Sequence, residues 1–156
     1  MIQSRRTFLK GSMAGSAVAI AVGAGLLTPQ SVLAAWPKAA FEAKGVDSAM
    51  STLFGTTAAA ASSDIKIKAP DIAENGAVVP VSVTAGHPGI ESISILAAAN
   101  ASPLCASFDL GSSAEGFVST RIKMGKTSQV IAVVKAGGKV YSASKDVKVT
   151  IGGCGG

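Results

Sequence analysis

At Asp64-Ile65-Lys66-Ile67-Lys68 the sequence begins to alternate between apolar and polar residues, with Ile65 and Ile67 as the apolar members. Successive side chains of a β-strand point to opposite faces of its sheet, so this period of two predicts a strand with one buried face. Residues 38–54 have a helical spacing instead, and a linker separates them from position 64. We therefore expect the chain to change from helix to strand here, and residues 64–151 to form a β-domain.

Alternating or wholly apolar segments continue toward the end of the chain. They lie at 79–83, 92–95, 104–110, 118–124, 130–134, 139 onward and 147–151. Pro80 lacks a backbone N–H, which indicates an edge strand or a bulge. Gly137-Gly138 is the signal of a two-residue hairpin. About seven short strands separated by turn residues predict an all-β fold, an immunoglobulin-like antiparallel β-sandwich.

Residues 35–63 are expected to be a helical lead-in followed by a linker. Apolar residues recur at helical spacing: Val46, Met50 and Leu53. Asp47 is placed to cap a short helix after Gly45, and Gly55 is expected to end that helix. The Ala- and Ser-rich residues 56–63 then link the helix to the first strand.

The N-terminus carries the pattern of a twin-arginine export signal. Ser4-Arg5-Arg6-Thr7-Phe8-Leu9-Lys10 supplies the charged start, and a weakly apolar run follows over residues 14–27. A membrane anchor requires about 20 strongly apolar residues, which this run lacks. We expect residues 1–34 to be removed, so that the mature protein begins near Ala35 in the periplasm and is not held in the membrane.

The charge and the residue types exclude several classes of function. The 14 basic and 9 acidic residues give a net charge of +5, and residues 1–34 contain three basic residues and no acidic one, so +2 remains after their removal. The remaining lysines are scattered, so we expect no nucleic-acid binding. Two cysteines and one histidine, far apart in the sequence, do not form a metal site, and we expect no cofactor. Because twin-arginine export carries folded proteins, we expect a folded partner to be exported with this chain.

The last five residues, Gly152-Gly153-Cys154-Gly155-Gly156, place one reactive side chain among four glycines. Glycine loses the most entropy when it is ordered, so we expect a flexible tail, and five extended residues reach about 17 Å. Such a tail is thin enough to enter a narrow active-site channel. An exposed thiol has a pKa of about 8.5, and no cation is adjacent to lower it, so partner enzymes are expected to activate Cys154.

A second thiol, Cys105, lies in a predicted strand. Strict alternation places it on the same face as Ser107 and Asp109. Cysteine is also often buried as a small apolar residue, and a disulfide with Cys154 is a further alternative, although a permanent one would block the tail thiol.

Other polar residues give weaker signals. His87 precedes Pro88-Gly89 and is expected in a solvated turn without a catalytic role. Asn100 begins a glycosylation sequon, which the bacterial export signal makes irrelevant. Arg121, Lys123 and Lys126 suit either a solvated strand face or a positive patch for oxyanions or acidic partners.

Together the twin-arginine start, the helical lead-in, the strand pattern and the terminal tail resemble the SoxY family, the sulfur-carrier subunits of the bacterial thiosulfate-oxidising complex. The resemblance implies that Cys154 holds sulfur intermediates covalently. It implies a swinging arm made of the surrounding glycines: Gly152, Gly153, Gly155 and Gly156. The implied partners are a SoxZ-like β-sandwich subunit in a heterodimer, a periplasmic heme enzyme that couples thiosulfate to the thiol, a sulfate-releasing hydrolase and a sulfur dehydrogenase.

Three other functions remain as alternatives. An enzyme is disfavoured because the sequence contains no acid–base pair or nucleophile–base spacing. A carrier that forms a thiocarboxylate on a terminal Gly-Gly matches Gly155-Gly156, but export away from ATP and the neighbouring cysteine disfavour it. A structural or binding immunoglobulin-like module needs only the fold, and the tail alone argues against it.

Overall fold

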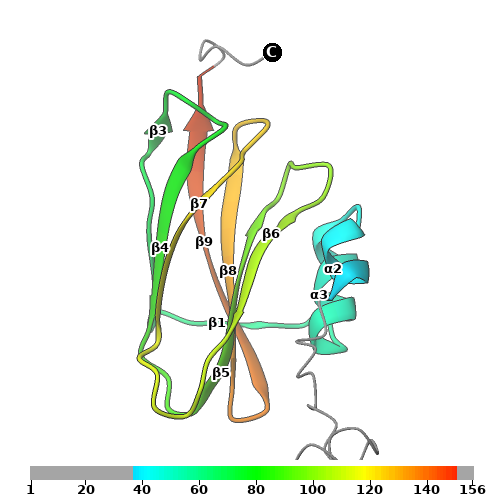
Figure 1. Cartoon of the computed structure of the whole chain (residues 1–156), viewed down its shortest axis with the longest axis vertical. Coiled ribbons are helices and arrows are strands. Elements are labelled where there is room, and N and C mark those ends of the chain that lie inside the picture. The colour runs from blue at the N-terminus through cyan, green and yellow to red at the C-terminus, as the bar shows by residue number, and fades with distance from the viewer. Residues whose placement is uncertain (1–36, 151–156) are drawn as a thin grey trace, which may run out of the picture. The chain divides into compact units, whose positions relative to one another are not determined.

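Two short helices precede nine strands in the part of the chain that the computed structural model describes, residues 37–150 (Figure 1). The helices are α2 (Lys38–Glu42) and α3 (Val46–Phe54). The strands are β1 (Ala60–Ala61), β2 (Ile65–Lys68), β3 (Ile72–Ala73), β4 (Val79–Ala85), β5 (Ile90–Ala97), β6 (Leu104–Asp109), β7 (Phe117–Ile122), β8 (Ser128–Ala136) and β9 (Lys139–Val149). Within this range, neither helix has the length and hydropathy of a membrane span.

The strands form two sheets. One has the order β1-β9-β8-β5-β6, with β3 also paired with β9, and the other has the order β2-β4-β7. The longer strands all pair antiparallel, which confirms the predicted all-β sandwich. The two-residue strands β1 and β3 pair in parallel with β9. The sequence does not predict them, and it places the residues of β1 in the linker.

The core lies between the facing surfaces of the two sheets. Along β4 the residues Val79, Val81 and Val83 are buried while those between them are accessible, as the period of two predicts. The three valines belong to the same apolar cluster as Ile93 and Ile95 of β5. Full burial of each such side chain stabilises the fold by about 1.5–3 kcal/mol.

The two helices cover the other face of the larger sheet, beside β5, β6 and β8 (Figure 1). Ala49 and Met50 of α3 pack with Leu96 and Val133, which point away from the sandwich core. Leu104 at the start of β6 belongs to this second cluster. The larger sheet is therefore buried on both faces over part of its area.

The ends of α3 agree only in part with the sequence prediction. Gly55 adopts the left-handed conformation with φ of 70° and ends the helix, as predicted. Gly45 is the N-cap residue of α3, and no side chain forms a capping hydrogen bond. The prediction that Asp47 caps α3 is wrong because this residue lies inside the first turn, where its charge still favours the helix dipole.

The sheet register shows how Pro80 and the Gly137-Gly138 pair are accommodated. The prediction that Pro80 marks an edge strand or a bulge is wrong, because Pro80 lies in β4, the central strand of its sheet, and pairs with Arg121 on one side. The pairing of β2 with β4 reaches only as far as Ser82, so Pro80 has a locally free edge where its missing N–H is tolerated. Gly137 and Gly138 have φ values of 55° and 72°, which confirms the tight β8–β9 hairpin.

Candidate functional site

The end of β9 is the structural base of the C-terminal tail. Val147 is fully buried, and the Val149 amide donates to the Thr127 hydroxyl at 2.9 Å. The Thr127 hydroxyl in turn donates to the Val149 carbonyl at 3.3 Å. On the other side, the Thr150 amide donates to the Ala73 carbonyl at 3.1 Å. Both flanks of the last described residues are thus fixed to the sandwich.

The predicted attachment residue itself lies outside the described residues. This holds for Cys154 and for the four predicted arm residues, Gly152, Gly153, Gly155 and Gly156, and also for the twin-arginine segment. Cys154 is four residues beyond Thr150, which allows a separation of at most about 14 Å. The assignment of these residues remains a prediction.

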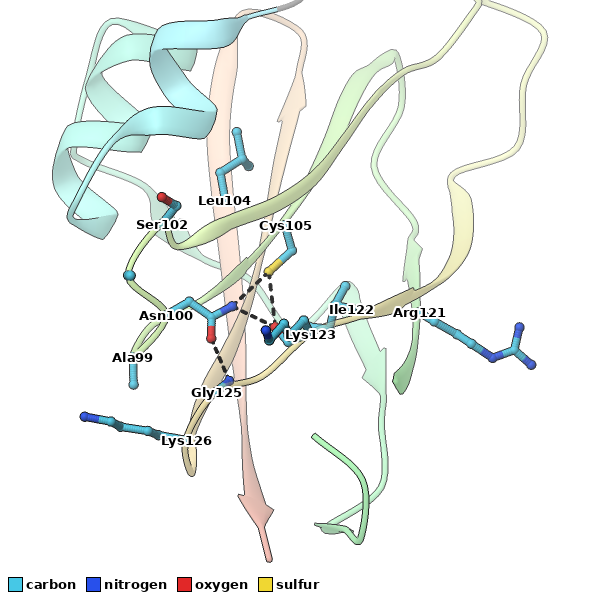
Figure 2. Close-up of a pocket in the computed structure, with 11 residues that line it drawn as sticks. Ala99, Asn100, Ser102, Leu104, Cys105, Arg121, Ile122, Lys123, Gly125 and Lys126 are labelled. Atoms are coloured by element: carbon cyan, nitrogen blue, oxygen red, sulfur yellow. Dashed lines mark hydrogen bonds between the residues drawn. The ribbon is translucent and has the colours of Figure 1, made fainter. Parts of the chain in front are cut away.

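Cys105 is placed on the opposite face from the one that strict alternation predicts. The β5–β6 register passes from Ile95 opposite Ala106 to Leu96 opposite Leu104, so Cys105 is the extra residue of a bulge. The bulge directs Leu104 toward the helices and the Cys105 thiol toward Asn100 (Figure 2). Cys105 consequently packs against the sandwich core, which supports the interpretation as a small apolar residue.

The environment of Cys105 keeps its thiol neutral. Burial raises the pKa of the Cys105 thiol, while hydrogen bonds involving the Ala97 backbone and the Asn100 side chain act in the opposite direction. The Asn100 amide lies 3.6 Å from the sulfur, and the thiol donates to the Pro103 carbonyl at 3.4 Å. Because the thiolate is the reactive form, this cysteine is poorly suited to carry a substrate.

Asn100 joins the β5–β6 loop to the segment after β7. Its side-chain nitrogen donates to the Lys123 carbonyl at 2.7 Å, and its oxygen accepts from the Gly125 amide at 2.9 Å. The sequence shows Asn100 only as part of a glycosylation sequon, and no local pattern reveals this bridging role. The two loops are therefore held in one arrangement by side-chain hydrogen bonds.

A hollow of about 700 Å³ lies between these two loops. We call it the basic hollow; its polar and charged lining residues are Asn100, Ser102, Cys105, Arg121, Lys123 and Lys126. Arg121, Lys123 and Lys126 all line this hollow and are exposed. Of the two alternatives that the sequence allows, a solvated strand face and a positive patch, this arrangement matches the positive patch. Figure 2 shows Arg121 and Lys126 extending to opposite sides of the Asn100–Cys105 contact.

The prediction that His87 lies in a solvated turn is wrong. Its Nε2 is 3.1 Å from the Ser62 hydroxyl, and its ring lies 4.2 Å from the ring of Tyr141. The side chain is partly buried and joins the linker after α3 to β9. Among residues 37–150 no group of His, Cys, Asp and Glu is arranged to hold a metal ion.

The sequence of the chain matches a known family over most of this domain and the tail. Residues 50–154 match the model of the family described as "Sulfur oxidation protein SoxY", a match that begins in α3 and ends at Cys154. The chain belongs to the SoxY family. The sequence-based resemblance is thereby confirmed.

Solved structures agree with this assignment. The sulfur carrier protein SoxY from Chlorobium limicola f thiosulfatophilum is 50% identical, with a TM-score of 0.62, and the match covers 67% of this chain and 96% of that one. A superoxide reductase (neelaredoxin) from Ignicoccus hospitalis is 22% identical, with a TM-score of 0.50, covering 55% of this chain and 80% of that one, which shows similarity of fold alone. No curated protein sequence is significantly similar to the chain.

Proposed function

We propose that this protein is a sulfur carrier of thiosulfate oxidation and that Cys154 is the attachment point. The observation that carries the proposal is the family match, which ends on Cys154. The chain has two cysteines, and the other one, Cys105, is a half-buried thiol with a raised pKa in the body of the sandwich. Chemistry and position therefore favour Cys154.

The loading step balances as an oxidative coupling. The Cys154 thiol and the terminal sulfur of thiosulfate form one S–S bond, with release of the thiol proton and of two electrons. The electrons pass to the partner heme enzyme. In the S-thiosulfonate, water and the hydrolase release the sulfonate group as sulfate and leave a persulfide on Cys154. The sulfur dehydrogenase then accepts the electrons of the outer sulfur while water supplies its oxygen atoms, and a second hydrolysis releases sulfate and returns the free thiol.

The described part of the chain supplies a fixed base for this chemistry. Hydrogen bonds on both sides hold Val149 and Thr150 to Thr127 and Ala73. The sequence beyond this base, residues 151–156, includes four glycines and the thiol of Cys154. The protein contributes reach and presentation, and partner enzymes contribute catalysis.

The family also supports the assembly and location. A SoxZ-like β-sandwich subunit is the proposed heterodimer partner, and folded export of the pair by the twin-arginine route to the periplasm explains the Ser4–Lys10 pattern. Apolar residues on the flank next to the tail base remain exposed, with Ile72 at 58% and Val78 at 48%. A partner subunit that packs there is compatible with these values.

The proposal is tested by intact-mass measurement after incubation with thiosulfate and the thiosulfate-oxidising enzyme. The wild type and Cys105→Ser are expected to gain one thiosulfate-derived adduct that a reductant removes, and Cys154→Ser is expected to gain none. Equal loading of Cys154→Ser would contradict the proposal. Loss of the adduct in Cys105→Ser alone would move the attachment point to the other thiol.

A further inference from the structure

The basic hollow lies at the end of the sandwich from which the tail departs. Lys126 directly precedes Thr127, the residue whose hydroxyl is bonded to Val149 at the end of β9. The β5–β6 loop, the β7–β8 loop and the end of β9 share this end of the domain (Figure 1). A macromolecule that receives the tail from this end therefore meets the basic hollow.

The cations of the basic hollow have no acidic partner in the described part of the chain. The ion pairs within residues 37–150 are Lys38–Glu42, Lys135–Glu91 and Lys145–Asp71. None of them involves Arg121, Lys123 or Lys126, and no acidic residue lines the hollow. A fourth cation, Lys44 from the turn between the helices, reaches the rim and donates to the Ser102 hydroxyl at 3.4 Å. The local potential is therefore positive and uncompensated.

The shape of the basic hollow favours an extended acidic surface over a single small oxyanion. A volume of about 700 Å³ is far more than one tetrahedral anion fills. Arg121 and Lys126 extend in opposite directions and do not converge on one point (Figure 2). The Asn100 side chain, which could donate to a small anion, already bonds to backbone groups of Lys123 and Gly125.

We propose that the basic hollow is a docking site for an acidic protein segment, a loop rich in Asp and Glu beside the active-site channel of an enzyme that receives the tail. This inference rests on the proposed carrier function. Several carboxylates spread over such a segment match several cations spread over the hollow. Electrostatic attraction of this kind mainly accelerates encounter, which suits a carrier that visits several enzymes in turn and leaves each of them.

The direct test is an NMR titration of the purified protein with hexaglutamate, with inorganic sulfate in parallel. We expect saturable shifts of the Asn100, Gly125 and Lys126 amides with hexaglutamate that weaken with added salt. The variant Lys123→Glu/Lys126→Glu is expected to bind about tenfold or more weakly. The matched control is Lys139→Glu at the start of β9, about 33 Å along the strand from Val149, and it is expected to bind like the wild type.

Three results would overturn the inference. Binding of hexaglutamate to Lys123→Glu/Lys126→Glu as tight as to the wild type would exclude the basic hollow as its site. Shifts distributed equally over Lys66, Lys68 and Lys139 would show nonspecific attraction. The same shifts produced by sulfate at equal concentration would identify a small-oxyanion site instead.

The inference and the carrier proposal fail in different ways in a loading assay with the thiosulfate-oxidising enzyme. Lys123→Glu/Lys126→Glu is expected to load about tenfold more slowly at low ionic strength and to approach the wild-type rate in 1 M salt, where the Debye length is about 3 Å. Its Cys154 is expected to react with iodoacetamide at the wild-type rate. Unchanged loading in low salt refutes the docking site, whereas an adduct on Cys154→Ser refutes the carrier proposal.

Discussion

Replacement of Thr127 by Val is expected to loosen the base of the tail without disturbing the core. The substitution preserves the side-chain shape and removes the hydroxyl that accepts from the Val149 amide and donates to the Val149 carbonyl. Two neutral hydrogen bonds contribute about 1–3 kcal/mol together, and because Thr127 is exposed, water replaces part of that contribution. We therefore expect the free energy of local opening at Val149 to fall by about 1.4 kcal/mol, which corresponds to a tenfold change in equilibrium constant.

The assay is amide hydrogen exchange at Val149, read by NMR or by mass spectrometry of a C-terminal peptide. Thr127→Val is expected to accelerate exchange at Val149 about tenfold while leaving exchange in the buried strand β5 unchanged. Thr84→Val is the matched control, because Thr84 is exposed on β4 and its hydroxyl bonds to none of residues 37–150. Exchange at Val149 within twofold of wild type would refute the view that Thr127 fixes this end of β9.

Three further predictions concern the thiol, a close backbone contact and a surface ion pair. Burial raises the pKa of Cys105, so the folded state favours the neutral thiol. The free energy of unfolding is therefore expected to fall as the pH rises above about 8.5. Urea unfolding at pH 7 and pH 10 should show that Cys105→Ala loses this pH dependence. Gly76→Ala places a methyl group against the Met124 carbonyl and Val149, so it should lower the free energy of unfolding by about 1–3 kcal/mol. The control Gly111→Ala faces open space and should change this free energy by less than about 0.5 kcal/mol. The contact with Lys135 at 2.7 Å and the Gly138 amide lower the pKa of Glu91. Lys135→Ala should therefore raise the pKa of Glu91, measured by NMR titration of its carboxyl group. An unchanged pKa would contradict the pairing.

The strand pattern was predictable because burial on one face leaves a direct record in the sequence. The valines of β4 and the Gly137-Gly138 turn appear where the period and the turn chemistry place them. The two-residue strands β1 and β3 leave no such record, since their pairing with β9 depends on tertiary contacts alone. Pro80 predicts an edge strand or a bulge, but β4 is the central strand of its sheet, and the short length of β2 that leaves Pro80 unpaired on one side is visible only in the register.

The site divides in the same manner. A cysteine among four glycines is recognisable from local composition, so Cys154 stands out in the sequence. The face of Cys105 depends on a bulge, and one extra residue in β6 reverses the alternation that the sequence suggests. The basic hollow depends on how the two sheets pack together, because Asn100 follows β5 of the larger sheet and Lys123 follows β7 of the smaller one, 23 residues away in sequence.

The central claim is that sulfur is carried on Cys154, and the most direct measurement locates the adduct in the native protein. Protein isolated from cells oxidising thiosulfate is digested with trypsin under nonreducing conditions, and cleavage after Lys148 releases residues 149–156 with Cys154 as their single cysteine. We predict a thiosulfate-derived, reductant-sensitive mass addition on this peptide and an unmodified thiol in the peptide that contains Cys105. An unmodified C-terminal peptide together with an adduct on Cys105 would contradict the account.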